Sequence, residues 1–254
     1  MLKKADLMTA ERILHSILVL AALSGAGANT AFADNDFIVY SPHVVQGQSE
    51  VEAYGFSYQD ARSDLNGASG YNISVAHAFT SWWKAEVYVG SFNRNPGETT
   101  HLTGYEFENT FQLSAPGEFW ADIGFLASYE YSKQRDTSDS VEFGPLLEKL
   151  SGHVDQRLNL IWKMPVGGGT GVANEFRSAY SISYKTEYHR ATFAPGIEAY
   201  YRPGDSATQA GPVLYGELRT DAGNELEYSL GVVYGLSRGA PDKTLLARLE
   251  YEFF

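Results

Sequence analysis

The feature of this chain that most constrains its fold is a two-residue alternation of apolar and polar side chains that recurs along most of its length. Near the end of the chain, for example, Leu245, Ala247 and Leu249 alternate with Arg248 and Glu250. Only an extended strand places every second side chain on one face, so each such run predicts a β-strand with one apolar and one polar face. Twelve runs follow this rule: 50–59, 70–79, 82–92, 101–113, 118–132, 141–150, 154–164, 175–186, 192–201, 212–220, 225–236 and 243–253.

The connectors between these runs alternate in length. Longer ones such as 60–69 and 165–174 follow odd-numbered strands, and shorter ones such as 80–81 and 151–153 follow even-numbered strands. Outer-membrane barrels show this asymmetry between long external loops and short periplasmic turns. A soluble β-sandwich also alternates, but it gives no reason for the asymmetry. We therefore predict an all-β fold, a transmembrane antiparallel up-and-down β-barrel of about 12 strands, with ten as the nearest alternative.

Aromatic side chains on the apolar faces gather near strand ends. A membrane barrel places aromatic girdles at both interfaces, whereas a sandwich core concentrates bulk at strand centres. Because proline lacks a backbone donor, Pro145 and Pro195 each predict a bulge in a closed barrel. The predicted interfacial aromatics are Tyr71, Trp83, Tyr129, Trp162, Tyr251 and Phe253.

The first 33 residues resemble a leader and not part of the barrel. Basic residues precede an apolar run, and Ala31 and Ala33 form a small-residue cleavage site, so we expect a signal peptide over 1–33. A membrane anchor is the competing interpretation, although the run is shorter than a spanning helix requires. We expect 34–48 to be an extended periplasmic lead-in, with entry into the lumen as the alternative, and 49–254 to form the barrel.

With these features together, the chain resembles bacterial outer-membrane β-barrel proteins. The stretches "FGPLLEK" (143–149) and "APGIEAYY" (194–201) are similar to those of uncharacterised proteobacterial outer-membrane proteins, and "YEF" (251–253) is similar to the family's aromatic ending. The chain departs from that ending at Phe254, an extra residue after Phe253, which is the aromatic that continues the apolar alternation of the last strand. The resemblance implies location in the cell outer membrane, contact with membrane lipid, and recognition of the last strand by the barrel-insertion machinery.

The charge of the chain excludes one class of partner. Lys3, Lys4 and Arg12 account for three of 19 basic residues, and Asp6 and Glu11 for two of 31 acidic ones, which leaves 16 against 29 and a charge of −13 after the leader. Nucleic acid is therefore not an expected partner. The chain contains no cysteine, so stability must come from burial and backbone pairing.

The polar faces of the predicted strands carry the candidate functional residues. Polar side chains cost several kcal/mol in hydrocarbon, so they must face the lumen. A basic wall and an acidic wall that face each other across the lumen would create a transverse electric field, and this field would orient polar solutes. The predicted basic wall is Arg157, Lys163, Arg177 and Lys185, and the predicted acidic wall is Glu86, Glu106, Glu108, Asp122, Glu130 and Glu142.

These residues support passive passage or binding of a small polar solute, with carboxylates favouring cations or zwitterions. The main alternative is a non-conducting structural or surface-interaction barrel in which the same residues form ion pairs. In that alternative large side chains that point inward fill the lumen, and the candidates are Tyr88, Trp120, Leu126, Leu146 and Tyr200.

A lipid-acting hydrolase is a distant third hypothesis. It would need Ser91 and His101 as nucleophile and base on the lipid-facing parity, but the His-x-Ser arrangement of outer-membrane phospholipases is not present in the sequence. We expect no metal, because the histidines show no ligand spacing, and no cofactor.

Overall fold

The structure is a computed structural model that describes residues 37–134, 137–167, 174–186, 192–219 and 223–254. The predicted signal peptide, 1–33, lies outside the described residues. Among the residues described, no helix is long and apolar enough to cross a membrane. The strands are β1 (Ser49–Gln59), β2 (Ser69–Thr80), β3 (Trp83–Arg94), β4 (His101–Gln112), β5 (Asp122–Ser132), β6 (Asp139–Ser151), β7 (Val154–Val166), β8 (Glu175–Tyr184), β9 (Ala194–Arg202), β10 (Ala207–Arg219), β11 (Glu225–Gly235) and β12 (Lys243–Phe253).

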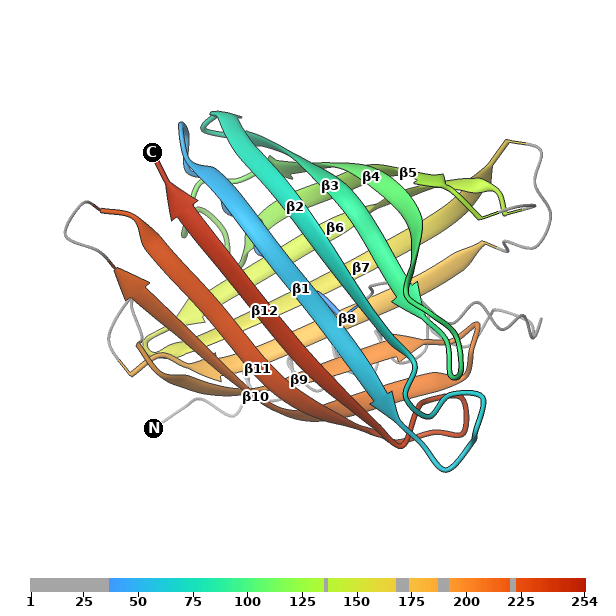
Figure 1. The fold of residues 1–254 in the computed structure, drawn as a ribbon. Coiled ribbons are helices and arrows are strands. Elements are labelled where there is room, and N and C mark those ends of the chain that lie inside the picture. The colour runs from blue at the N-terminus through green and yellow to red at the C-terminus, as the bar shows by residue number, and fades with distance from the viewer. Residues whose placement is uncertain (1–36, 135–136, 168–173, 187–191, 220–222) are drawn as a thin grey trace.

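The strands close into one antiparallel barrel in which each pairs with its neighbours in sequence (Figure 1). The first and last strands complete the cylinder, with Ser49 opposite Phe253 and Gln59 opposite Lys243. Closure satisfies the edge groups that an open sheet would leave unpaired. The predicted fold class and the strand number of 12 are confirmed. We call the end with Ser49 and Phe253 the proximal end and the opposite end the distal end.

Side chains alternate between the two faces of the wall, as the sequence pattern predicts. On β2, Tyr71, Ile73 and Val75 are exposed on the outer surface, whereas Asn72 and Ser74 are buried inside. The same alternation recurs around the cylinder, so an apolar exterior surrounds an interior that holds the buried polar and charged side chains together with two apolar clusters. This arrangement suits hydrocarbon outside and polar groups within.

The six predicted interfacial aromatics lie on the outer face. Trp83 stacks on Phe79 at 5.0 Å between ring centroids, and Tyr251 stacks on Phe253 at 5.9 Å. Tyr71, Tyr129 and Trp162 are exposed there as well. Their role at the membrane interface stays a prediction.

Two details of the strand pattern differ from expectation. The connector 113–121 lies at the proximal end and is as long as the distal connector 60–68, so the predicted length asymmetry is only partly present. The chain turns there through Gly117, at a φ of 76°, and β5 starts only at Asp122. Trp120 lies in this connector and is 71% exposed, so the expectation that it fills the lumen is wrong. Tyr88, Leu126, Leu146 and Tyr200 are buried as expected.

The prolines do not produce bulges. Around Pro145 the β6–β7 register is the same on both sides, and the pairing only skips Gly144 and Pro145. A Cβ at Gly144 would lie 1.8 Å from the Leu160 carbonyl oxygen, so the wall requires glycine there. Pro195 pairs with Leu214 in an unbroken register with β10. The register shifts lie elsewhere, in β3 between Tyr88 and Phe92 and in β2 between Ala78 and Thr80.

The segment 37–48 runs inside the barrel. Phe37 is buried against the distal part of β1, and Gln48 lies at the proximal start of that strand. The expected extended lead-in is thus replaced by its alternative, entry into the lumen. The physical reason is that Phe37, Ile38 and Val39 bury apolar surface that a lead-in would leave in water.

Candidate functional site

The candidate site is the lumen, and its first component is the inner segment, which we define as residues 37–48. The Tyr40 backbone is held from both sides by Asn159, which accepts from the Tyr40 N–H at 2.7 Å and donates to the Tyr40 carbonyl at 3.0 Å. Ser41 donates to Glu148 at 2.6 Å. Side chains of the wall thus supply the hydrogen bonds of a backbone that is not paired as a strand.

The proximal part of the inner segment makes further polar contacts. His43 Nε2 lies 2.9 Å from Asp122 Oδ2, and the Val44 N–H donates to Gln112 at 2.8 Å. These contacts come from side chains of the wall. At its last residues the segment also pairs through its backbone, because the Gly47 N–H donates to the Ala78 carbonyl of β2 at 2.8 Å and the Gln48 carbonyl accepts from the Ala78 N–H at 2.9 Å. The segment therefore joins the hydrogen-bond ladder where it leads into β1.

The second component is an aromatic cluster at the distal part of the lumen. The Phe37 ring centroid lies 5.5 Å from that of Phe56 and 5.1 Å from that of Tyr200. Tyr58 contacts both phenylalanines, and the Tyr200 hydroxyl donates to the Phe37 carbonyl at 3.2 Å. Leu246 of β12 is part of the same cluster. This side of the lumen is therefore packed with apolar side chains.

The third component is an ion-pair cluster formed by Glu130, Glu142, Lys163 and Arg177, on β5 to β8. Lys163 Nζ lies 2.7 Å from Glu130 Oε2 and 3.3 Å from Glu142 Oε1. Arg177 Nη2 lies 2.6 Å from Glu142 Oε2. Lys163 and Glu142 are register partners on adjacent strands, so these predicted basic and acidic residues are neighbours and do not face each other across a gap.

The other predicted acidic residues have separate surroundings. Glu86 and Glu108 are buried opposite each other on β3 and β4. Glu106 is the register partner of Glu130. Asp122 holds His43, as described above. Residues of the predicted acidic wall therefore either belong to or lie beside the ion-pair cluster, or, like Asp122, contact the inner segment.

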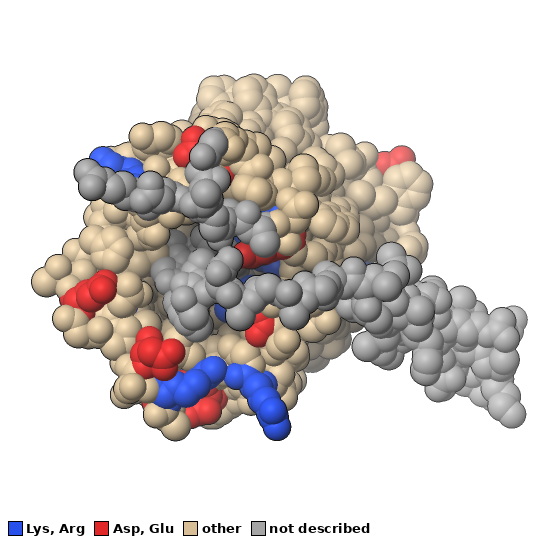
Figure 2. Space-filling view, turned by 90° about the vertical axis from the view of Figure 1, so that its right-hand side faces the viewer, with Lys and Arg blue, Asp and Glu red and all other residues tan. Residues whose placement is uncertain are grey.

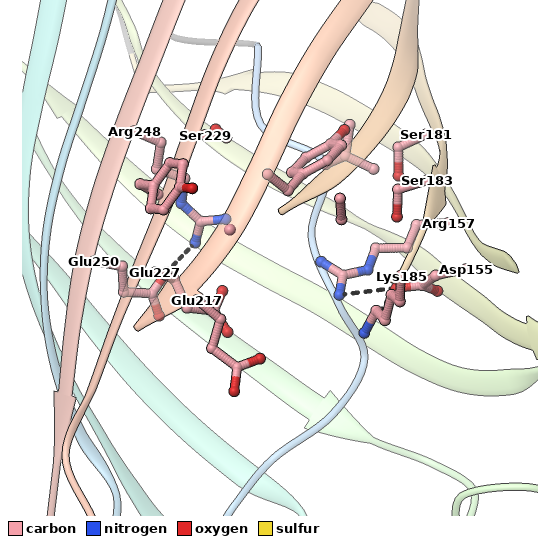
Figure 3. A pocket seen from close by; sticks show the side chains of 15 residues that line it. Asp155, Arg157, Ser181, Ser183, Lys185, Glu217, Glu227, Ser229, Arg248 and Glu250 are labelled. Carbon is pink, nitrogen blue, oxygen red and sulfur yellow. Dashed lines mark hydrogen bonds and ion pairs between the residues drawn. The ribbon is translucent and has the colours of Figure 1, made fainter. Parts of the chain in front are cut away.

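The remaining predicted basic residues, Arg157 and Lys185, line a cavity of about 90 Å³ (Figure 3). Arg157 Nε lies 3.1 Å from Glu148, and both Arg157 and Lys185 lie 3.4 Å from Asp155. A volume of this size has room for about three water molecules at liquid density. The cavity therefore suits water or a small ion.

An acidic group faces these cations across the cavity (Figure 3). It consists of Glu217, Glu227 and Glu250, from β10, β11 and β12. The carboxylates that lie opposite Arg157 and Lys185 here come from the last three strands and not from β3 to β6, where the acidic wall is predicted from the sequence. Arg248 lies on the same side and pairs with Glu250 at 2.5 Å. We call this arrangement the charged constriction.

A block of glutamates at the seam between β1 and β12 continues this acidic side. Glu50 is opposite Glu252, and Glu52 is opposite Glu250. Lys84 pairs with Glu50 at 2.7 Å. Sequence reasoning did not select Glu50 and Glu52, although their polar parity in the first strand was a usable signal. With Glu250 and Glu252, Glu50 forms a set of carboxylates whose oxygens lie within 4.8 Å of one another, and so do Glu217, Glu225 and Glu227.

The residues of the hydrolase hypothesis are not brought together. Ser91 lies opposite Gly104, and His101 lies opposite Asn93. His101 Nδ1 is 3.4 Å from the Thr99 carbonyl oxygen. Ser91 is buried and not on the lipid face, because the register shift in β3 changes its parity.

A known structure shares this architecture. An outer membrane channel from Pseudomonas putida F1 superposes with a TM-score of 0.55 at 14% identity, covering 86% of this chain and 98% of that chain. A triple mutant of the Rhodopseudomonas blastica porin aligns over 81% of this chain and 98% of its own at 10% identity, with a TM-score of only 0.27, which carries no argument. No protein-family model and no curated protein matches the chain. The chain has the fold of bacterial outer-membrane barrels.

Proposed function

We propose that this protein is an outer-membrane channel for small polar or ionic solutes, with a lumen narrowed by its inner segment. The observation that carries the proposal is the charged constriction, in which Arg157 and Lys185 face Glu217, Glu227 and Glu250. Opposed charges across a narrow water-filled space orient a dipolar or charged solute, as they do in ion-selective pores. The similar fold of the Pseudomonas putida channel supports the same class of function.

The carboxylates around the constriction favour cations or zwitterions over anions. The same residues line a wider cavity that continues toward the proximal end, where Glu225 and Glu252 join them. An entering anion would therefore meet a carboxylate-rich surface, whereas a cation would be attracted to it. We propose small cations and zwitterions as the solute class.

The test is conductance of the full-length protein in a planar lipid bilayer, with selectivity taken from the reversal potential in a salt gradient. We expect discrete conductance steps and a preference for cations that increases in Arg157→Glu and Arg177→Glu. Lys133→Glu is the matched control, because Lys133 is exposed and lies over the Tyr105 ring on the outer surface. Selectivity that is unchanged in both arginine variants would remove these residues from the mechanism.

A non-conducting barrel is the second candidate, and the filling of the lumen favours it. The inner segment, the aromatic cluster and the ion pairs together occupy much of the interior. Complete absence of conductance steps from correctly folded protein would support this candidate over the channel.

A further inference from the structure

Two connectors at the distal end are exposed along most of their length but anchor a few buried residues against the barrel. They join β1 to β2 (residues 60–68) and β11 to β12 (residues 236–242), so they lie on either side of the seam where the barrel closes (Figure 1). Leu65 of the first connector has no exposed surface, and Ala240 and Pro241 of the second are buried. Ala68 belongs to the aromatic cluster. Apolar burial on this scale is unusual for connectors that project freely.

Arg62 joins the two connectors through its guanidinium. On its own connector, Nε and Nη2 donate to the two oxygens of Asp60 at 2.8 and 2.7 Å. Across the seam, Nη1 donates to the Arg238 carbonyl at 3.0 Å and Nη2 to the Ala240 carbonyl at 2.6 Å. A planar guanidinium held by a carboxylate in this two-pronged geometry is among the stronger and more directional contacts in proteins.

Asp60 and Asp242 complete the junction with backbone hydrogen bonds. Asp60 accepts from the Asp242 N–H at 2.9 Å, and Asp242 accepts from the Ala61 N–H, also at 2.9 Å. The Arg62 guanidinium beside Asp60 holds the pKa of that carboxyl well below its usual range. Asp60 is therefore ionised beside the Arg62 cation at neutral pH.

The second connector is also fixed to a third one, the turn 203–206 between β9 and β10. Ser237 donates to the Ser206 carbonyl at 2.6 Å and accepts from the Thr208 N–H at 2.8 Å. A Cβ at Gly239 would lie 1.8 Å from the Asp205 carbonyl oxygen, so only glycine permits this close approach. The three connectors thus form one layer above the aromatic cluster.

We propose that connectors 60–68 and 236–242 form a lid on the distal mouth, and that Arg62 is the side chain that keeps this lid shut. Figure 2 shows this end of the molecule, where acidic and basic side chains are scattered around the rim and do not gather in one patch. The lid covers the side of the mouth formed by β1, β2 and β9 to β12, directly above the aromatic cluster. Its effect on conduction rests on the proposed channel function, whereas its opening can be measured without conduction.

The experiment uses Leu65→Cys in the full chain, which contains no native cysteine, so a maleimide reports on this position alone. With the Arg62 contacts intact, we expect labelling of folded protein in lipid vesicles to be very slow, because Leu65 is fully buried. Adding Arg62→Ala should accelerate labelling by about tenfold or more, because several charge-assisted hydrogen bonds are lost together. Arg62→Lys should lie between the two, because an ammonium group cannot reproduce the planar fork.

Arg238→Ala is the matched control. It removes the same charge from the same rim, but the Arg238 contribution to the junction is its backbone carbonyl, which the substitution leaves in place. Labelling that is equally fast with and without Arg62, or equally accelerated by Arg238→Ala, would overturn the proposal. If Arg62→Ala does not fold, Asp242→Ala tests the same junction, because it removes the acceptor of the Ala61 N–H, and unchanged labelling there would also overturn it.

A conductance measurement on the same variants distinguishes failure of the lid proposal from failure of the proposed channel function. If the protein is a channel, Arg62→Ala should increase the fraction of time spent conducting. Faster labelling of Leu65→Cys without any conductance in any variant would support the lid and count against the channel.

Discussion

Two sides of the lumen hold their side chains by different forces. The aromatic cluster on the β1, β9 and β12 side is packed by apolar contact, with ring centroids about 5 to 6 Å apart. The ion-pair cluster on β5 to β8 is held by charge-assisted hydrogen bonds, such as Lys163 to Glu130 at 2.7 Å. Apolar packing excludes water, whereas charged groups retain it. A polar solute moving through the distal half should therefore follow the ion-pair side.

The inner segment connects these two regions. Phe37 belongs to the aromatic cluster, Tyr40 packs beside Leu126 and Leu146, and Ser41 and His43 bind carboxylates. The segment is thus held by apolar contacts at its distal end and by polar contacts at its proximal end. Its removal would affect both sides of the lumen at once.

The largest expected effect is on conductance, from deletion of residues 37–45. We expect the single-channel conductance in a planar bilayer to rise several-fold, because the deletion clears a length of chain from the lumen without removing a strand residue. Retained barrel folding is checked by heat-dependent mobility on a gel. The matched control is His43→Ala, which removes one polar contact and leaves the segment in place. A folded deletion variant with unchanged conductance would show that the segment does not occlude the pathway.

The next effect is on stability, from Lys163→Glu in the ion-pair cluster. Lys163 is only 6% exposed, and the substitution would place a third carboxylate beside Glu130 and Glu142. Leaving a buried charge uncompensated costs about 3–5 kcal/mol of unfolding free energy. Reversible urea unfolding in lipid vesicles measures this loss, and Lys133→Glu on the exposed surface should change it by less than about 0.5 kcal/mol. Equal stability of the two variants would mean that water stabilises the carboxylates of the cluster well enough without Lys163.

The strands and their faces could be predicted from the sequence because period-two burial is a local property. Each run such as 70–79 shows which side chains face lipid without knowledge of its neighbours, and β2 confirms it. The inner segment could not be placed in this way. Its stretch "FIVYSPHVV" shows no alternation, and its partners are remote, with Tyr40 and Asn159 separated by 119 residues.

Which charged residues lie opposite each other across the lumen could not be predicted from the alternation within single strands either. Parity identifies Arg157 and Glu227 as inward-facing, but which strands face each other depends on the closure and stagger of the whole cylinder. From the sequence, the acidic residues of β3 to β6 are the predicted partners of the basic residues on β7 and β8. In the closed barrel β10 to β12 face β7 and β8 across the constriction.

The smallest expected effect is the pH dependence of the distal lid. Asp60 has a pKa held well below its ordinary value by Arg62, and Asp64 and Asp242 are the other carboxyl groups that act on Arg62. A carboxyl with a lowered pKa in the folded state contributes stability that is complete above its ordinary value, about 3.9, and is lost as pH falls through the folded value. The lid should therefore stay shut over the whole range from about pH 5 to pH 8.

Maleimide labelling of Leu65→Cys checks this expectation if each rate is divided by that of Ser63→Cys at the same pH. Ser63 is exposed in the same connector, so the ratio removes the pH dependence of the thiol itself. A constant ratio is expected, because Asp60 remains ionised throughout the range. A ratio that rises between pH 8 and pH 5 would assign control of the lid to a group that titrates near neutrality, and it would mean that the junction at Arg62 is not what limits its opening.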